Sequence, residues 1–325
     1  MSEEKRVWNV SSNPHIRSGM RTRSIMLLVI LSLMPACGVG IYNFGPRALA
    51  VIGVTVAAAV LTEGIYGWCR HKVTVGDCSA VVTGLLLALN LPVGLPLWMA
   101  ALGAVFAILV VKLLFGGLGQ NFMNPALAGR CFLLISFPKQ MADFTTKAFQ
   151  LGSVTWDAYT GATPLAALKA GETVNVLDMI VGRTAGTIGE TSVIALVVGA
   201  CLLILCGVID LRIPGSYILT FVLFVGLFGG KGFDPYYLSA QLAGGGLMLG
   251  AFFMATDYVT RPITVKGQYL FGIFLGIMTG IFRLFGPGAE GVSYAIILGN
   301  LLVPLIEKVT APTPFGYEKG GGKDA

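Results

Sequence analysis

The sequence predicts an all-α integral membrane protein with about ten transmembrane helices, arranged as two inverted five-helix repeats. Three observations predict this fold class. Hydrophobic residues make up 55% of the 325 residues and charged residues only 12%, which is about half the charged share of soluble domains. The mean hydropathy is +0.80. Apolar runs recur from Ser24 to Val309, and most are long enough to cross the hydrocarbon core of a bilayer.

Ten apolar segments of roughly 20 residues account for the predicted helices. They cover residues 24–43, 48–69, 77–92, 96–116, 124–138, 188–209, 213–229, 235–256, 266–285 and 289–309. The segments at 77–92 and 124–138 are short for a perpendicular span. We expect them to be broken or re-entrant, because non-helical backbone is tolerated at membrane depth only where protein surrounds it.

The positive charges predict the orientation. They gather in the N-terminal segment, in the turns at 70–72 and 210–212, in the segment 257–266 and in the C-terminal tail. All of these fall on one side of the predicted membrane, which marks that side as cytoplasmic and explains the net charge of +6 without a nucleic-acid partner. The expected regions are a cytoplasmic segment 1–23, a first half 24–138, an outward loop 139–187, a second half 188–309 and a cytoplasmic tail 310–325.

A faint internal repeat supports the two halves. Gly84–Pro92 is similar to Gly250–Asp257, and each is followed by another span and a Gly-rich break. Two five-helix units would lie in opposite membrane orientations, the inverted-repeat plan of many transport folds. Gly-rich apolar segments also resemble one another by chance, so the sequence leaves this repeat open.

Seven ionisable residues lie within predicted spans or at their ends, where burial of charge is costly. They are Glu63, Asp77, Glu190, Asp257, Arg261, Arg283 and Glu290. Each can be a group that reaches the headgroups or pairs with a neighbour. Glu63, inside an apolar run, and Asp257, at a span end with Arg261 near enough to pair, are the best candidates for an ion path.

Few residues suggest a metal or nucleotide site. Six cysteines lie in or beside apolar runs without a C-x-x-C pair, and the two histidines are isolated, so we expect no metal site made by this chain alone. A cluster shared with another subunit stays open. The chain has no Gly-rich strand–turn–helix of the Rossmann type, and no catalytic residue is identified. Asn124 before Pro125 predicts a helix N-cap, or a half-helix whose amides meet a ligand.

The stretch D-A-Y-T-G-A-T, residues 157–163, stands out in the outward loop. It presents hydroxyl groups on small, accessible residues. One interpretation is an ordinary turn in which Thr163 caps a helix that begins at Pro164. The other is a hydroxyl that a modifying enzyme recognises. A Thr nucleophile would need a base, and the nearest acid is Asp157, so the loop does not predict a catalytic threonine.

This stretch resembles the flavinylation motif D-x-x-[ST]-G-A-[ST], in which the last hydroxyl carries FMN through a phosphodiester bond. Further segments resemble the same family in the same order: Pro14–Ser18, F-M-N-P-A-L-A-G-R at 122–130, G-R-T-A-G-T-I-G-E-T-S at 182–192 and A-T-D-Y-V-T-R-P at 255–262. The family is the D subunit of the Rnf complex, homologous to the B subunit of the sodium-translocating NADH:quinone reductase. The length of 325 residues, without the longer N-terminal extension of the quinone-reductase protein, favours Rnf.

The resemblance implies a ten-helix, two-repeat subunit in the bacterial cytoplasmic membrane, with covalent FMN on Thr163 at the outer side. A separate flavin transferase would attach it. Gly161 and Ala162 would keep the loop slim enough to enter that enzyme, Asp157 would contact it, and Thr160 would be a hydrogen-bonding neighbour.

The resemblance also implies a function that the chain performs only within a complex. The complex moves electrons between ferredoxin and NAD, coupled to Na⁺ or H⁺ translocation. Its other members would be the flavin-bearing G, the iron–sulfur A, B and E, and the NAD-side C subunits. A second, noncovalent flavin (riboflavin) is left open. So are three alternatives: a cofactor-free transporter or channel, a scaffold subunit, and a B-type subunit of a quinone-reducing complex.

Overall fold

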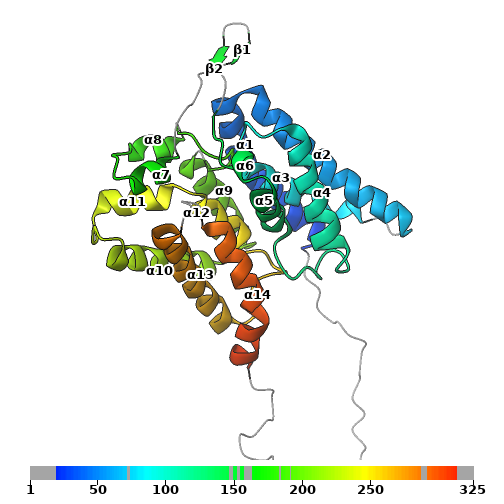
Figure 1. Ribbon diagram of the computed structural model, residues 1–325. Helices are drawn as coiled ribbons and strands as arrows, with labels where there is room; N and C mark the ends of the chain where they lie inside the picture. The colour runs from blue at the N-terminus through cyan, green and yellow to red at the C-terminus, as the bar shows by residue number, and fades with distance from the viewer. Residues whose placement is uncertain are drawn as a thin grey trace, which may run out of the picture.

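The computed structural model of the protein describes residues 20–71, 74–145, 149–151, 154–156, 163–182, 184–190, 192–286 and 291–312. They form a helical protein in two groups of helices, with a region of short elements between them along the chain (Figure 1). The first group, coloured blue to teal, lies mainly on the right of Figure 1, and the second, coloured green to red, lies mainly on the left.

The first half contains five helical segments that match the first five predicted ones. Its elements are α1 (Thr22–Phe44), α2 (Pro46–Cys69), the 3₁₀ turn η1 (Val75–Asp77), α3 (Ser79–Leu89), α4 (Leu97–Phe106), the π-helix η2 (Ala107–Leu113) and α5 (Pro125–Ser136). Gly45, with φ of 72°, separates α1 from α2. Pro46 then begins α2, at a position where its missing N–H is not needed.

The connecting region carries short elements that the apolar pattern did not predict. They are α6 (Pro138–Met141), the strands β1 (Phe149–Leu151) and β2 (Val154–Trp156), α7 (Pro164–Lys169) and α8 (Val176–Val181). The two strands form an antiparallel hairpin in which Phe149 pairs with Trp156. In Figure 1 the hairpin is at the top of the molecule, whereas the C-terminal end of α14 (Val292–Thr310) is at the bottom.

The second half matches the last five predicted segments. Its elements are α9 (Val193–Leu205), α10 (Arg212–Phe228), α11 (Pro235–Ala243), α12 (Leu247–Leu249), the π-helix η3 (Gly250–Met254), α13 (Val265–Phe285) and α14. The predicted span 235–256 is bent by 64° between α11 and α12. Gly245 and Gly246 lie at this bend with φ of 66° and 64°, a left-handed conformation that glycine adopts without a steric penalty.

The helices confirm an all-α membrane protein. Each of the ten predicted segments contains helix, and α1, α2, α13 and α14 are long and apolar enough to cross a membrane, with the bent α11–η3 pair as a fifth candidate. The helices α3 and α5 have 11 and 12 residues, which is too short for a perpendicular span. The number of ten spans therefore stays a prediction.

Packing is similar in the two halves. The second helical segment packs on the fourth in each half, α2 on α4 and α10 on α13. The fourth also packs on the fifth, α4 on α5 and α13 on α14, while α1 packs on α9 and joins the halves. These pairings are what a structural repeat requires. The inverted orientation of the two units stays a prediction.

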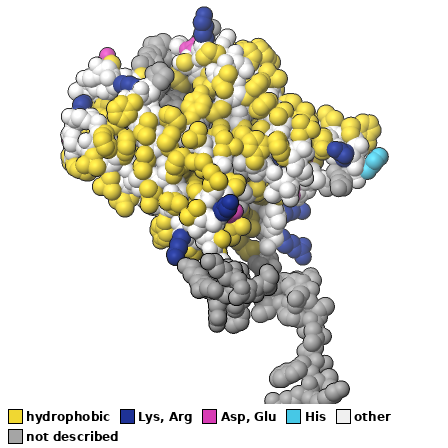
Figure 2. All heavy atoms as spheres, turned by 60° about the horizontal axis from the view of Figure 1, so that its bottom comes forward, with side chains coloured by type: hydrophobic (Ala, Val, Ile, Leu, Met, Phe, Trp, Pro, Cys, Tyr) yellow, Lys and Arg dark blue, Asp and Glu magenta, His cyan; other side chains and the backbone are white. Residues whose placement is uncertain are grey.

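The surface is apolar over wide areas. Figure 2 shows hydrophobic side chains across most of the described face, with Lys and Arg at a few scattered places. Large side chains such as Leu61, Ile65, Leu205 and Leu227 are each more than 60% exposed. Continuous apolar surface of this extent is rare on soluble monomers, and it fits contact with lipid.

Candidate functional site

Thr163 is the N-cap of α7. Its backbone is extended, with φ of −60° and ψ of 149°, and its Oγ1 accepts a hydrogen bond from the Ala166 amide at 3.4 Å. The interpretation of Thr163 as a helix cap is therefore confirmed. The side chain is half-buried, and among the described residues its hydroxyl oxygen has this one long hydrogen bond. The other motif residues Asp157, Thr160, Gly161 and Ala162 lie outside the described residues.

Thr163 borders a narrow cavity of about 20 Å³, which is room for about one water molecule. The opposite walls are the turn at 184–186, the side chain of Glu190 and the bend at Gly244 and Gly245. The segments 182–192 and 243–246, distant from Thr163 in sequence, thus form its immediate surroundings.

Arg283 of α13 holds the bend beside this cavity. Its guanidinium, only 4% exposed, donates to the carbonyl groups of Gly244 at 2.8 Å and Gly245 at 3.1 Å, and also to the carbonyl of Gln241. These carbonyls end α11 and have no helical partner there. The sequence identified Arg283 as a costly charge, and the structure shows that it pairs with backbone oxygens.

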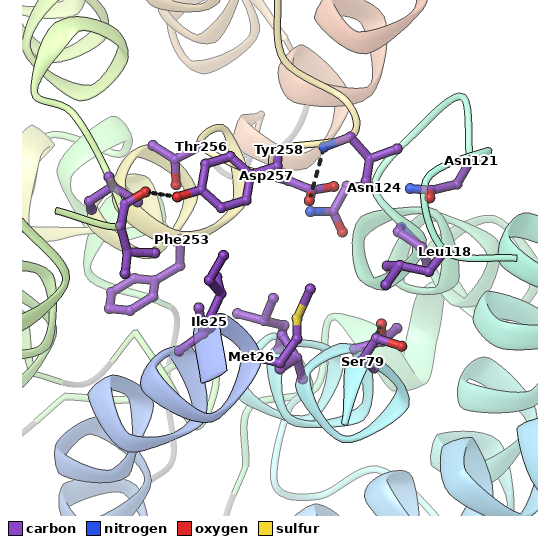
Figure 3. Close-up of a pocket in the computed structure, with 18 of the residues that line it drawn as sticks. Ile25, Met26, Ser79, Leu118, Asn121, Asn124, Phe253, Thr256, Asp257 and Tyr258 are labelled. Atoms are coloured by element: carbon purple, nitrogen blue, oxygen red, sulfur yellow. Dashed lines mark hydrogen bonds between the residues drawn. The ribbon is translucent and has the colours of Figure 1, made fainter. Parts of the chain in front are cut away.

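A second cavity, of about 90 Å³, lies between the two halves (Figure 3) and is called the central cavity below. Its walls come from α1, α3, the end of η2, the start of α5, η3 and the connection that follows η3. Ile25, Met26 and Phe253 provide apolar surface, whereas Asn124 and Asp257 provide polar groups (Figure 3). A mostly apolar space with a few convergent polar groups is typical of ligand sites.

Asn124 has the first of its two predicted roles, that of a helix N-cap. Its Oδ1 accepts from the amides of Ala126 at 3.0 Å and Leu127 at 3.4 Å, so it caps α5, with Pro125 at the first helical position. Its Nδ2 donates to the carbonyl of Met254 at 3.4 Å, across to the second half. The cap thus also fixes the wall of the central cavity.

Asp257 lies in the connection after η3, outside the spans, and also lines this cavity. It accepts hydrogen bonds from the Thr260 hydroxyl at 3.1 Å and the Val259 amide at 3.5 Å. Burial raises the pKa of the Asp257 carboxyl above its ordinary value, and these hydrogen bonds oppose the rise. The Arg261 guanidinium lies over the ring of Tyr258, 4.5 Å from its centre.

Glu63 forms a buried ion pair with Lys112 of η2. The Lys112 ammonium is 2.9 and 3.0 Å from the two carboxylate oxygens and donates to the Ser79 hydroxyl at 2.5 Å. The Thr74 hydroxyl donates to the same carboxylate at 2.8 Å. Lys112 and Ser79 also line the central cavity. Glu63 itself does not line it, but its partner brings the pair to the cavity wall.

Two buried cations were missed by the sequence reasoning. Lys112 is a single charge in the apolar run V-V-K-L-L-F, and Arg130 follows the cap at Asn124 by six positions. Arg130 donates to Asn90 at 3.0 Å and to Ser293 at 3.1 Å, which links the two halves. A lone charge inside an apolar segment was the signal that could have identified both.

The candidate residues therefore divide between two places. The central cavity is lined by Asn124, Asp257 and Lys112, which is the partner of Glu63. Thr163 lies at a different cavity, together with Glu190 and the bend after α11. Within the described ranges, no three His, Cys, Asp or Glu side chains are grouped so that they could hold a metal ion.

Comparison with known proteins identifies the family to which the chain belongs. Residues 9–316 match the sequence profile of the NQR2, RnfD, RnfE family. The chain is 48% identical to the D subunit of the Na⁺-translocating ferredoxin:NAD⁺ oxidoreductase complex of Acetobacterium woodii, over 95% of this chain and 96% of that protein. It is 41% identical to the D subunit of the proton-translocating ferredoxin:NAD⁺ oxidoreductase complex of Clostridium ljungdahlii, over 97% and 98% of the two chains. A third relative, the D subunit of the ion-translocating oxidoreductase complex of Actinobacillus succinogenes, is 35% identical over 97% and 99%. The chain therefore belongs to the NQR2, RnfD, RnfE family, and within it to the D subunits of the Rnf complex.

Proposed function

We propose that the chain is the D subunit of an ion-translocating ferredoxin:NAD⁺ oxidoreductase, and that it relays electrons through FMN bound covalently to Thr163. The observation that carries the proposal is the half-buried Thr163, which ends the motif D-A-Y-T-G-A-T and borders a cavity. Three relatives that match nearly the whole chain are named as D subunits of ion-translocating oxidoreductase complexes, which supports membership of such a complex. The chain would act only together with the A, B, C, E and G subunits.

The surroundings of Thr163 fit a phosphodiester at Oγ1. Within the described part of the chain, this oxygen accepts one long hydrogen bond, from the Ala166 amide, and it borders a cavity. An ester at this oxygen removes the hydroxyl proton and leaves a lone pair for that amide. The flavin, when attached, accepts and passes on electrons, while the protein sets its position and its access to water. The neighbouring Asp157, Thr160, Gly161 and Ala162 would be recognised by the flavin transferase.

We place both termini in the cytoplasm and the flavin loop outside the bacterial cytoplasmic membrane. The positive charges support the cytoplasmic position of the termini. The hairpin and the end of α14 lie at opposite ends of the molecule in Figure 1, which supports the outer position of the flavin loop.

The coupling ion is Na⁺ or H⁺. The named relatives at 48% and 41% identity translocate different ions, so similarity to either does not select one. We propose that Glu63 and Asp257 belong to the ion path, because Asp257 lines the cavity between the halves and Glu63 is paired with Lys112, which also lines it. Activity measured with and without Na⁺ at fixed pH separates the two ions.

We propose that the central cavity can admit a second cofactor, a noncovalent flavin such as riboflavin. Its apolar walls at Ile25, Met26 and Phe253 suit an aromatic ring, and Asn124 and Asp257 suit the polar edge of that ring. The space of about 90 Å³ must widen to admit one. Acid precipitation of the purified chain, followed by chromatography of the supernatant, would reveal this flavin. A supernatant without flavin would contradict it.

The covalent flavin is tested by two substitutions at one position. Asn is as good an N-cap as Thr but has no hydroxyl, whereas Ser retains both. With the flavin transferase coexpressed, Thr163→Ser and Thr160→Ala should give a fluorescent band on a denaturing gel, and Thr163→Asn should give none. Fluorescence that persists in Thr163→Asn would rule out this attachment site.

The same experiment separates the rival functions. A cofactor-free transporter or a scaffold subunit would show no fluorescence even in the parent chain. A B-type subunit would fluoresce, so the complete complex must be assayed. Ferredoxin-dependent reduction of NAD⁺ supports our proposal, and quinone reduction in its place supports the B-type alternative.

A further inference from the structure

A third cavity, of about 290 Å³, lies along α7 on the side of the molecule that holds Thr163. Its floor is buried and consists of Leu165, Leu168, Tyr237, Gln241 and Arg283. Its size is near the lower end of the range for small-molecule pockets, about 300–1,000 Å³. Buried apolar and aromatic walls with a few polar groups are also typical of such pockets.

The exposed rim of this cavity is aromatic and cationic. Phe228 and Phe285 contribute rings that are 58% and 67% exposed. Lys169 and Lys231 contribute ammonium groups. That of Lys169 donates to the carbonyl of Gly286, and that of Lys231 lies 5.2 Å from the centre of the Tyr237 ring. Among the residues that the structure describes, the charged side chains that line the cavity are thus all cations, two at the rim and Arg283 at the floor.

The cavity adjoins the Thr163 site. Leu165, two residues after Thr163, lines both spaces. Arg283, at the floor of the larger cavity, donates to the carbonyls of Gly244 and Gly245, which line the smaller one. Leu165 lies in the first turn of α7, next to the Thr163 cap. A group attached to Thr163 Oγ1 by a flexible chain can therefore reach this cavity.

We propose that this cavity holds the isoalloxazine ring of the flavin carried by Thr163, an inference that rests on the proposed function. The Tyr237 ring and the leucines pack against the ring system, and the Gln241 amide, which donates to the Tyr237 hydroxyl at 3.3 Å, lies among them. Lys169, Lys231 and Arg283 stabilise the negative charge that the ring gains on reduction. Nearby cations of this kind raise the potential of a bound flavin.

The rim lysines give the sharpest test because they are exposed, so their loss leaves the core intact. The full chain is coexpressed with the flavin transferase as the parent, Lys231→Met, Lys169→Met and the conservative Lys231→Arg. Lys139→Met is the matched control, since Lys139 is also exposed and in the same connecting region but lines no part of this cavity. Denaturing-gel fluorescence measures attachment. Spectroelectrochemical titration and visible circular dichroism measure the potential and surroundings of the attached ring.

We expect all five chains to carry flavin. Lys231→Met and Lys169→Met should lower the flavin's midpoint potential and change its dichroism, whereas Lys231→Arg and Lys139→Met should match the parent. Tyr237→Leu should increase the native fluorescence, because a tyrosine in contact with the ring quenches it. Attached flavin with the same potential and dichroism in every variant would overturn the docking site and leave the proposed function intact. A parent chain without attached flavin would overturn both.

Discussion

Glu63 of α2 and Lys112 of η2 form an ion pair with an N···O distance of 2.9 Å and with only 1% and 2% of the two side chains exposed. Burial of two charges is costly, and their attraction compensates only when further hydrogen bonds complete the site. Ser79 and Thr74 provide those hydrogen bonds. The pair is therefore stable as a unit, and either partner alone would be an unpaired charge in the protein interior.

Removal of one charge of the pair should lower the stability of the fold much more than removal of both. Lys112→Met and Glu63→Gln should each lower the free energy of unfolding by about 3–5 kcal/mol. The double variant should recover a large part of this loss, because no charge then stays unpaired. Thermal unfolding of the four chains in detergent measures the coupling. Additive losses in the double variant would show that the two side chains do not act as a pair.

The α11–α12 bend should tolerate no side chain at Gly245. Gly245→Ala adds the strain of a left-handed backbone, roughly 1–2 kcal/mol, and its Cβ would meet Leu165 and Arg283, for roughly 1–3 kcal/mol more. Gly207→Ala is the control, since its φ of 67° is almost the same and its Cβ would meet nothing within 4 Å. Equal losses of thermal stability in the two variants would argue against close packing at the bend.

Neutralisation of Glu63 or Asp257 should impair the coupling of electron transfer to ion translocation. In the complete complex, Glu63→Gln and Asp257→Asn should each slow ion-coupled electron transfer and alter its dependence on the cation concentration. Asp210→Asn makes the same chemical change at an exposed residue that lies 3.6 Å from Arg212, and it should have little effect. Parental rates and cation dependence in Glu63→Gln and Asp257→Asn would remove both residues from the ion path.

Two native cysteines report the orientation of the helices. Cys69 at the end of α2 and Cys206 after α9 are exposed, whereas Cys37 and Cys131 are buried. A membrane-impermeant maleimide should therefore label Cys69 and Cys206 in inverted vesicles and leave them unlabelled in intact spheroplasts. Labelling in spheroplasts would reverse the orientation proposed for the flavin loop.

Features that depend on neighbouring residues could be predicted from the sequence. Asn124 before Pro125 and Thr163 before Pro164 both cap helices as expected, because a cap involves only the next few residues. The ten apolar segments were likewise found, since hydrophobicity over about 20 residues is a local property.

Features that depend on distant residues could not be predicted. Glu63 and Lys112 are 49 positions apart, and nothing local indicates which charges meet. The bend within 235–256 was hidden by its apolar composition, although Gly244–Gly246 was a signal for it. The β1–β2 hairpin, by contrast, has a local signal, because apolar and polar residues alternate in F-Q-L and V-T-W on either side of Gly152-Ser153, but apolar runs of about 20 residues do not detect such short strands. Arg283 was noted as a costly charge, but its backbone partners become visible only once the bend places their carbonyls beside it.

The proposed function depends on a bond at a single oxygen atom, and the mass of the Thr163 peptide is its decisive test. The chain coexpressed with the flavin transferase is digested, and the peptide that contains residues 157–163 is analysed by tandem mass spectrometry, with Thr163→Asn as the control. We predict that this peptide is heavier by FMN less one water, that fragmentation assigns the addition to Thr163, and that the control peptide is unmodified. An unmodified parent peptide, or an addition assigned to Thr160, would contradict the proposed attachment.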